Sequence, residues 1–426
     1  MMSGIKGISG TMGTDYRVPR SDCSASLNTE TWTTSNALIA QHAGKATGVV
    51  TNTRVTHATP ASVYAHSAER DWECDSVMPP SARACKDIAR QLIEDEPGRN
   101  LNVIMGGGIQ AFISEPSKYS NDPLDTWACM RNDSRDLIRE WKSHKEQLSA
   151  SHAVVHDAGS LKNVDTEKTE YLLGLFGNGH MSFNYLRDKT DKGQPSLAQM
   201  ATTAVKILKN NPNGFFLMVE GGLIDYAHHR GRAKVALDEG IELNEAVNQT
   251  VHLLEELNIK DETLLIVTSD HCHTLSINGY PERGSSMLGI ADKSSADGIS
   301  YTTLTYAVSG PENFQYEVVN GVARRRDPLQ DDTTSWDYHQ QATIAQDESK
   351  HGGGDVNIYA TGPMAHLFHH VHEQSYVAHV VQYAAKMGRY KDRNVEKSPS
   401  SAMRLPSSSY ALTIVSALSL ALALLC

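Results

Sequence analysis

The chain has 426 residues, which is enough for two average domains or one large α/β domain. Its composition, 40% hydrophobic and 21% charged, is that of an ordinary globular protein. The formal net charge of -11 argues against a nucleic-acid partner, because phosphate backbones are bound through basic surfaces.

Apolar runs alternate with amphipathic stretches along most of the chain. Strands are expected at 46–55, 102–108, 214–220, 263–270 and 356–362, and the runs 214–220 and 263–270 are expected to be buried. A helix is expected from Thr59, its N-cap, to about residue 72, and others at 86–94, 196–211, 231–258 and 375–389. This alternation predicts an α/β fold, a three-layer sandwich with helices on both faces of a mostly parallel central sheet.

Residues 275–350 differ from the rest of the chain. They are richer in Gly, Ser, Asp and Tyr, and their periodicity is weak. We expect this segment to be an insertion between a core strand and its partner.

The C-terminal segment has the order of a GPI-attachment signal. The small-residue triplet Ser400-Ser401-Ala402 precedes a polar spacer and the uncharged apolar run 410–426. A transmembrane helix is the alternative, but the run is short and has no basic flank. We therefore expect residues 398–426 to be a spacer and a GPI signal, which would place the mature protein at the cell surface.

The first ten residues contain no apolar segment of the kind found in signal peptides. A GPI-anchored protein must enter the secretory pathway, so either the true start lies upstream of Met1 or the anchor is never attached. Asn132 and Asn248 begin glycosylation sequons, which suit a secreted protein. Six cysteines without CxxC spacing, four of them in the first third, suit one or two disulfides and leave the pairing open.

Acidic and histidine side chains gather where predicted strands end, which is where open α/β sheets bind ligands. In VEGGLIDYAHHR, residues 219–230, Glu220 ends a strand, and Asp225 and His229 are four residues apart. One helical turn would place Asp225 and His229 on one face, a good spacing for zinc ligands. The alternative is a solvated surface turn in which the aspartate is a cap.

A second group, Asp270, His271 and His273, directly follows the predicted strand 263–270. The adjacent Asp270 and His271 can reach one ion only if the strand has ended and both lie in a loop. The alternative is a helix N-cap aspartate beside ordinary histidines.

Three further residues could contribute to a site. Thr59 offers a hydroxyl at a helix N-terminus, and the Arg70 guanidinium could hold a phosphate with two hydrogen bonds. His351 precedes three glycines, which allow close approach of the backbone.

The histidine-rich segment 366–379 invites a metal-binding interpretation, but it has no carboxylate beyond Glu373 and no strand end at the right place. Its histidines are expected on loop and helix surfaces; they are His366, His369, His370, His372 and His379.

Taken together, these segments resemble alkaline phosphatases of the animal, membrane-anchored type. The matching runs include TNTRVTHATP, YAHSAERDW, NVIMGGG, GFFLMVEGGLIDYAHH, DETLLIVTSDHCH and HGGGDV, and they extend in family order from near residue 4 to about 388. The resemblance implies an α/β domain over residues 1–397 with a smaller crown-like insertion at about 275–350, usually in a homodimer. It implies hydrolysis of phosphomonoesters through a phosphoserine intermediate.

The resemblance also implies two zinc ions and one magnesium ion. By match, Asp225, His229 and His351 would bind the first zinc, Asp270 and His271 the second, and Thr59 and Glu220 the magnesium. Arg70 would hold the substrate phosphate, while His57 and His273 would contact ligands and not the metals. Imidazole and carboxylate suit zinc, whereas carboxylate and hydroxyl oxygens suit magnesium.

Two family residues have no counterpart in this sequence, the serine nucleophile and an early aspartate that bridges the second zinc and the magnesium. The segment VPRSDCSAS at 18–26 is a poor substitute, because Arg20 stands where the family has Asp. Neither Ser21 nor Ser24 is therefore expected to be the nucleophile, and the chain as written is expected to be nearly inactive.

The alternative function is a non-catalytic pseudophosphatase that binds metal or phosphate at the cell surface. A sulfatase-like or phosphodiesterase-like relative is disfavoured, because the Cys or Thr nucleophile motif of those enzymes is absent.

By the same resemblance, Cys23 pairs with Cys85, Cys74 and Cys129 are candidates for a second disulfide, and Cys272 is free. The carboxylates of the calcium site of vertebrate relatives align with Ser160, Gly177 and Gln194, and only Phe176 matches, so no calcium site is expected. Leu223 replaces a frequent arginine near the site.

Overall fold

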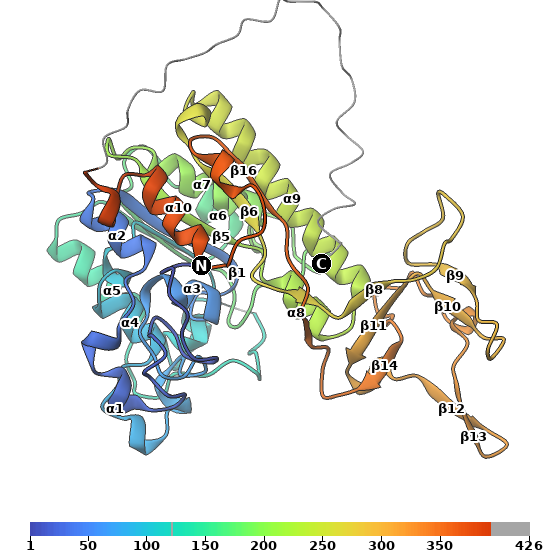
Figure 1. The fold of residues 1–426 in the computed structure, drawn as a ribbon. Coiled ribbons are helices and arrows are strands. Elements are labelled where there is room, and N and C mark those ends of the chain that lie inside the picture. Colours follow the sequence, from blue (N-terminus) through green and yellow to red (C-terminus); the bar gives the residue numbers. More distant parts are fainter. Residues whose placement is uncertain (121, 393–426) are drawn as a thin grey trace, which may run out of the picture.

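The structure is a computed structural model that describes residues 1–120 and 122–392 (Figure 1). The predicted spacer and GPI signal at 398–426 lie outside the described residues. Within the described part, no helix has both the length and the apolar character needed to cross a bilayer.

Five parallel strands form the central sheet, in the order β3-β4-β2-β1-β5. Their bounds are Ala46–Arg54 for β1, Val103–Gly107 for β2, His152–Val155 for β3, Tyr171–Leu175 for β4 and Phe215–Glu220 for β5. β1 and β2 are completely buried, as expected of parallel strands covered on both faces.

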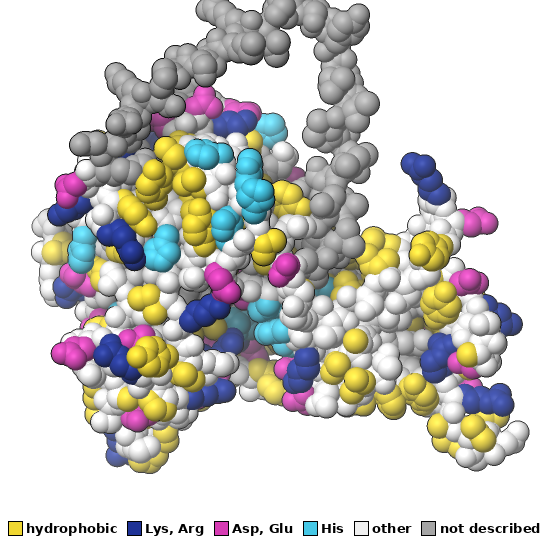
Figure 2. All heavy atoms as spheres, viewed as in Figure 1, with side chains coloured by type: hydrophobic (Ala, Val, Ile, Leu, Met, Phe, Trp, Pro, Cys, Tyr) yellow, Lys and Arg dark blue, Asp and Glu magenta, His cyan; other side chains and the backbone are white. Residues whose placement is uncertain are grey.

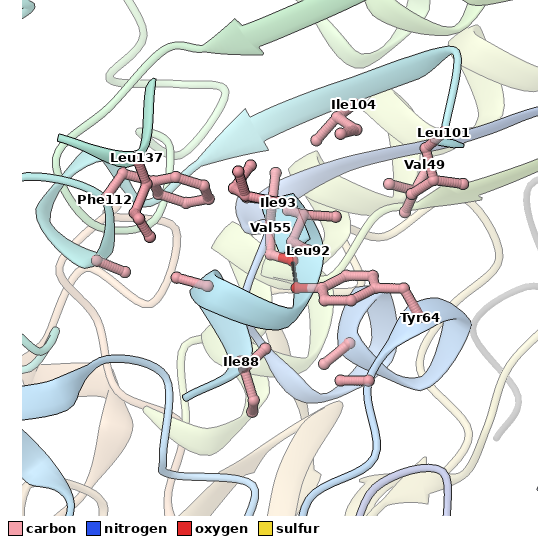
Figure 3. Close-up of a cluster of buried hydrophobic side chains, with 14 of the residues drawn as sticks. Val49, Val55, Tyr64, Ile88, Leu92, Ile93, Leu101, Ile104, Phe112 and Leu137 are labelled. Carbon is pink, nitrogen blue, oxygen red and sulfur yellow. Dashed lines mark hydrogen bonds between the residues drawn. The ribbon is translucent and has the colours of Figure 1, made fainter. Parts of the chain in front are cut away.

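Neighbouring residues of one strand enter different cores, which shows the three layers directly. Val49 and Ile104 pack with α3 (Ala58–Tyr64), α4 (Ile88–Glu94) and α5 (Leu137–Gln147), as Figure 3 shows in part. Val50 and Met105 pack on the other side with α7 (Leu197–Leu208) and α9 (Ala233–Glu256). This alternation follows from the two-residue period of a strand, and it confirms the predicted α/β sandwich.

Several helix starts follow from capping residues. Ser196 and Gln199 form a capping box at the start of α7, and the Asp87 carboxylate accepts a hydrogen bond from the backbone N–H of Arg90 in α4. The prediction of Thr59 as an N-cap is wrong. His57 occupies that position, and α3 ends at Tyr64, where the chain turns extended and the Tyr64 hydroxyl donates to the Val55 carbonyl (Figure 3).

The apolar run 263–270 does not join the parallel sheet. It forms β6 (Leu265–Thr268), which pairs antiparallel with β16 (Ile358–Thr361) in a separate two-stranded unit. Both β5 and β6 are only partly buried, because a large cavity lies along them. The expectation that these two strands are buried was therefore wrong.

The chain between β6 and β16 leaves the body of the protein and returns. It first forms β7 (Cys272–His273) and last β15 (His351–Gly352), which pair with each other. Between them lie small sheets that project away from the main body in Figure 1; their strands are β8 (Leu275–Ile277), β9 (Ile290–Lys293), β10 (Ser300–Thr302), β11 (Leu304–Ser309), β12 (Tyr316–Val319), β13 (Val322–Arg325) and β14 (Ala342–Ala345). The remaining α-helices are α1 (Cys23–Ser26), α2 (Asn36–His42), α6 (Ala158–Lys162), α8 (Leu223–His229) and α10 (Tyr376–Ala384).

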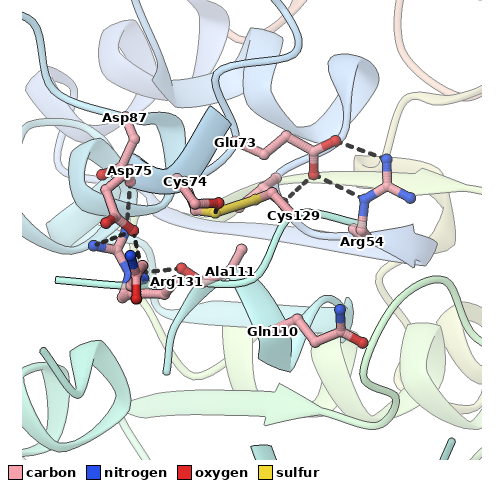
Figure 4. Close-up of a disulfide and its surroundings, with 12 residues drawn as sticks. Arg54, Glu73, Cys74, Asp75, Asp87, Gln110, Ala111, Cys129 and Arg131 are labelled. Atoms are coloured by element: carbon pink, nitrogen blue, oxygen red, sulfur yellow. Dashed lines mark hydrogen bonds and ion pairs between the residues drawn. A yellow bond between two sulfur atoms is a disulfide. The ribbon is translucent and has the colours of Figure 1, made fainter. Parts of the chain in front are cut away.

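Both expected disulfides are present, and each joins two segments that are distant in the sequence. Cys23 is bonded to Cys85 and Cys74 to Cys129, the latter beside the buried Arg131 (Figure 4). Cys272 is free and buried.

Candidate metal centre

The centre of the site is the carboxylate of Asp225, at the start of α8. Gly221 and Gly222 separate β5 from this short helix, so Asp225 and His229 share one face, as their spacing predicts. His229 Nε2 lies 3.4 Å from Asp225 Oδ1.

Two more imidazoles reach the same oxygen from the β7–β15 pair. His273 Nε2 lies 2.5 Å and His351 Nε2 3.3 Å from Asp225 Oδ1. The ligand atoms of Asp225, His229, His273 and His351 all lie within 4.8 Å of one another. One carboxylate and several imidazoles at this separation are a donor set that suits zinc.

These contacts set the charge of the carboxylate. Burial alone would raise the pKa of Asp225, but hydrogen bonds from His229, His273 and His351 outweigh it and hold that pKa well below its usual range. A lowered pKa favours the anionic form of Asp225, which is the form that binds a cation.

Asp270 and His271 lie beside this group, in the loop between β6 and β7. The loop position is the one that lets adjacent residues turn to the same side. His271 Nε2 lies 3.3 Å from Asp270 Oδ2 and 3.8 Å from Asp225 Oδ1, and its ring stacks on that of His351.

Glu220 and Thr59 also come together. The Glu220 carboxylate accepts hydrogen bonds from the hydroxyls of Thr51, at 2.5 Å, and Thr53, at 3.1 Å, and the Thr59 hydroxyl contacts it as well. Burial raises the pKa of Glu220 above its ordinary value, against these hydrogen bonds. A buried carboxylate surrounded by hydroxyl oxygens is a donor set that suits magnesium.

Among the residues that line the cavity, two buried imidazole nitrogens have no partner in the described part of the chain: Nδ1 of His57 and Nδ1 of His273. Burial lowers the pKa of His57 to about 4, so this ring is neutral at physiological pH. An orphaned nitrogen beside the carboxylate cluster is consistent with a bound water that an occupied metal site would hold.

These groups line one cavity of about 2110 Å³, which also contains Arg70. Figure 2 shows histidine side chains along the hollow between the main body and the inserted strands, with basic side chains close by. The cavity continues between β5 and β6, where Met1 and Met2 form part of its wall.

Other histidines lie outside the group. His228 Nδ1 is 2.8 Å from the Tyr306 hydroxyl, and burial lowers the pKa of His228 to about 3. Four histidines of the 366–379 segment are exposed, and the fifth lies on α10.

Several residues at the site were not singled out from the sequence. Thr51 and Thr53 are two of them, and their alternation at the end of β1 is the signal that could have found them. His180 is a third; its ring lies 5.1 Å from that of His57, and no motif marks it.

Residues 1–387 match the family described as alkaline phosphatase. The chain is 40% identical over 393 residues to the human tissue-nonspecific alkaline phosphatase, covering 91% of this chain and 71% of that protein. It is 35% identical over 398 residues to a membrane-bound alkaline phosphatase of Bombyx mori, covering 91% of this chain and 68% of that protein. An alkaline phosphatase from the Antarctic bacterium TAB5 shares the fold with a TM-score of 0.57 at 19% identity, over 91% of this chain and 82% of that one.

The family match, together with the carboxylate–imidazole cluster, thus places the chain among the metal-dependent phosphatases. The chain belongs to the alkaline phosphatase family.

Proposed function

We propose that this protein is built for phosphomonoester hydrolysis through a phosphoserine intermediate, with two zinc ions and one magnesium ion. The observation that carries the proposal is the convergence of His229, His273 and His351 on the Asp225 carboxylate. Asp225, His229 and His351 would hold one zinc, Asp270 and His271 the other, and Thr59 and Glu220 the magnesium. Two bound zinc ions would supply Lewis-acid stabilisation of the attacking and leaving oxygens.

The chain's own residues would bind and orient the substrate. Arg70 lines the cavity, and the acidic residues on either side of it in the sequence, Glu69 and Asp71, are paired with Arg20. Its guanidinium could therefore hold two phosphoryl oxygens. His273 would orient Asp225 through the 2.5 Å contact. His57, the N-cap of the helix that contains Thr59, would support the position of Thr59.

We propose that the exact chain is nearly inactive, because a serine nucleophile is missing from the site. Ser21 donates to the Glu69 carboxylate at 2.8 Å, and neither Ser21 nor Ser24 lines the cavity. Of the described residues lining the cavity, Ser269 is the one serine, and its hydroxyl donates to the backbone carbonyl of His271.

The cavity supports the view that a strand is missing between β5 and β6. Within the described residues, β5 pairs only with β1 and β6 only with β16, so each has a free edge along the cavity. The walls beside these edges include apolar side chains of α9 and α10, among them Leu243, Val247 and Val381. An extended segment carrying the early aspartate would satisfy both edges and add a carboxylate to the site.

The test compares p-nitrophenyl phosphate turnover at alkaline pH for this chain and for a chain extended by any in-frame segment found upstream of Met1, both loaded with zinc and magnesium. Activity restored by an extension that carries a serine supports the proposal. Substantial turnover by the short chain itself would show that the nucleophile is present. Stop codons upstream would favour the alternative, a pseudophosphatase that binds metal or phosphate without hydrolysis.

We also propose that the mature protein is a glycosylated homodimer attached to the cell surface by a GPI anchor. Two disulfides and the exposure of both Asn132 and Asn248 support an oxidising, extracellular location. Release of the protein from expressing cells by a phosphatidylinositol-specific phospholipase tests the anchor, and sedimentation velocity tests the dimer.

A further inference from the structure

We propose that Arg230 and Tyr226 form a second anion-binding subsite at the mouth of the cavity, which holds an acidic group on the leaving-group part of the substrate. The favoured substrates would be phosphomonoesters that carry a further phosphate or a carboxylate. This inference rests on the proposed phosphatase function, because Arg70 and the metal centre are taken to hold the reacting phosphate.

A row of side-chain contacts leads from His57 to Arg230 along one wall of the cavity. His57 and His180 lie ring against ring at 5.1 Å, and His180 and Tyr226 at 5.0 Å. The Arg230 guanidinium then lies 4.3 Å from the centre of the Tyr226 ring and donates to the Tyr226 hydroxyl. All of these residues and Arg70 line the same cavity, so a ligand bound at Arg70 can extend toward Arg230.

The charge on this wall is confined to its two ends. His180 Nε2 lies 2.9 Å from Nη1 of Arg54, and because a guanidinium can only donate, this ring nitrogen carries no proton and the His180 ring is neutral. The charge of Arg54 is neutralised by Glu73, which accepts hydrogen bonds from Nε at 2.8 Å and Nη2 at 2.7 Å. The net positive charge therefore lies at Arg70 and Arg230.

Arg230 has no carboxylate partner among the described residues, although carboxylates line the same cavity. Asp347 and Glu348 are both bound to Lys350, at 2.7 Å and 3.3 Å. The neighbouring Arg232 is bound to Asp337 and to the Trp336 carbonyl. A partly exposed guanidinium that is held by a tyrosine and left without a counter-ion is arranged to receive an anion from solution.

Tyr226 restrains the Arg230 side chain, which distinguishes it from an unrestrained surface arginine. The Tyr226 ring is packed between Phe183 and His180, so its hydroxyl and the stacked guanidinium have a fixed position. Fixing a long side chain before binding reduces the entropy lost when a ligand is bound. We therefore expect a measurable preference for doubly anionic ligands.

The test measures binding, since it must not depend on turnover. Isothermal titration calorimetry on the zinc-loaded chain compares alkylphosphonates of increasing length that end in a carboxylate with the matching amides. At the length that spans the wall, the carboxylate should bind about five-fold more tightly than the amide at low salt, and the difference should shrink as salt is added.

Arg230→Gln should abolish this preference without changing the affinity for the amide, and Arg230→Glu should reverse it. The matched control is Arg283→Gln, because Arg283 is exposed and does not line the cavity. Arg70→Gln should weaken both ligands equally. Equal affinity of the parent chain for carboxylate and amide at every length would overturn the subsite and leave phosphate binding intact. Failure of both ligands to bind would overturn the phosphate-binding proposal and the subsite with it.

Discussion

His273 and His351 face each other across the β7–β15 pair, and both direct Nε2 at one oxygen of Asp225. The β7–β15 pair brings together the two ends of the segment that contains the inserted strands. This segment therefore begins and ends at the metal centre. Residues almost 80 positions apart in the sequence are thereby held in register by a two-residue ladder.

This relationship predicts that His273 controls zinc affinity without being a ligand. His273→Ala removes the hydrogen bond that orients Asp225, and we expect zinc affinity to fall by about 10- to 100-fold. His229→Ala removes a proposed ligand and should cost more. Competition titration with a zinc-sensitive chelator measures both.

The control for this experiment is His252→Ala, because His252 is exposed on α9 and lies outside the cluster. Its zinc affinity should equal that of the parent chain. Unchanged zinc affinity in His273→Ala would show that Asp225 keeps its orientation without this contact.

Two glycines of neighbouring segments should respond to alanine in opposite ways. A Cβ added at Gly240, inside α9, meets nothing within 4 Å, so Gly240→Ala should raise the free energy of unfolding by about 0.5–1 kcal/mol. Gly231 has a φ of +63°, and a Cβ there would lie 2.1 Å from the side-chain nitrogen of the buried Asn313. Gly231→Ala should lower the free energy of unfolding by more than about 1 kcal/mol.

Urea unfolding of both variants and the parent chain gives the comparison. Both substitutions add the same methyl group. A difference in stability between the two variants therefore reports the local backbone conformation and the space around the new Cβ. Stabilisation by Gly231→Ala would contradict the steric argument.

The sequence predicts the local features well, because local spacing and capping determine them. The four-residue interval between Asp225 and His229 places both on one face of α8, and Ser196 begins α7 as its capping box requires. The strand pattern of 263–270 predicts a strand but not its neighbour: β6 pairs with β16 because the cavity separates it from β5. Hydrophobicity identifies strands but contains no information about which edges meet.

Contacts between distant segments are the part that spacing cannot predict. The wall formed by His57, His180 and Tyr226 joins the N-cap of α3, the loop after β4 and the helix α8. Likewise Thr59 was expected to be a helix N-cap, but it lies inside α3, and its hydroxyl contacts the Glu220 carboxylate.

Because Lys145 is buried, we expect it to make the free energy of unfolding rise with pH. Its side chain is completely buried, donates to the Arg99 carbonyl at 2.6 Å and lies 3.8 Å from the Tyr171 ring centre. Burial lowers the pKa of Lys145 to about 8, below its value in the unfolded chain. Between these two values the unfolded chain binds more protons at this lysine. The contribution of Lys145 to the free energy of unfolding therefore rises with pH, by at most about 1.4 kcal/mol per unit.

Urea unfolding at pH values from 8 to 10 tests this for the parent chain, Lys145→Met and the exposed control Lys142→Met. Other groups titrate in this range, so the informative quantity is the difference between variants. The parent chain and Lys142→Met should gain stability relative to Lys145→Met as pH rises. Parallel curves for all three would show that Lys145 keeps an ordinary pKa in the fold.

The buried ion pair beneath the second disulfide gives the last prediction (Figure 4). Arg131 is completely buried and donates to Asp87 at 2.6 Å and to the Ala111 carbonyl at 2.8 Å. Arg131→Met leaves the Asp87 carboxylate buried without its cation, so the free energy of unfolding should fall by about 3–5 kcal/mol. Adding Asp87→Asn should recover part of this loss, because asparagine is neutral and can still cap α4.

Urea unfolding under oxidising conditions, which keep Cys74 bonded to Cys129, measures the complete double-mutant cycle. Arg139→Met on the exposed side of α5 is the control and should change stability by no more than about 0.5 kcal/mol. If the two single losses simply add in the double variant, Asp87 does not depend on Arg131 for its charge. A coupling of about 1–3 kcal/mol would instead show that each partner, once buried, requires the other.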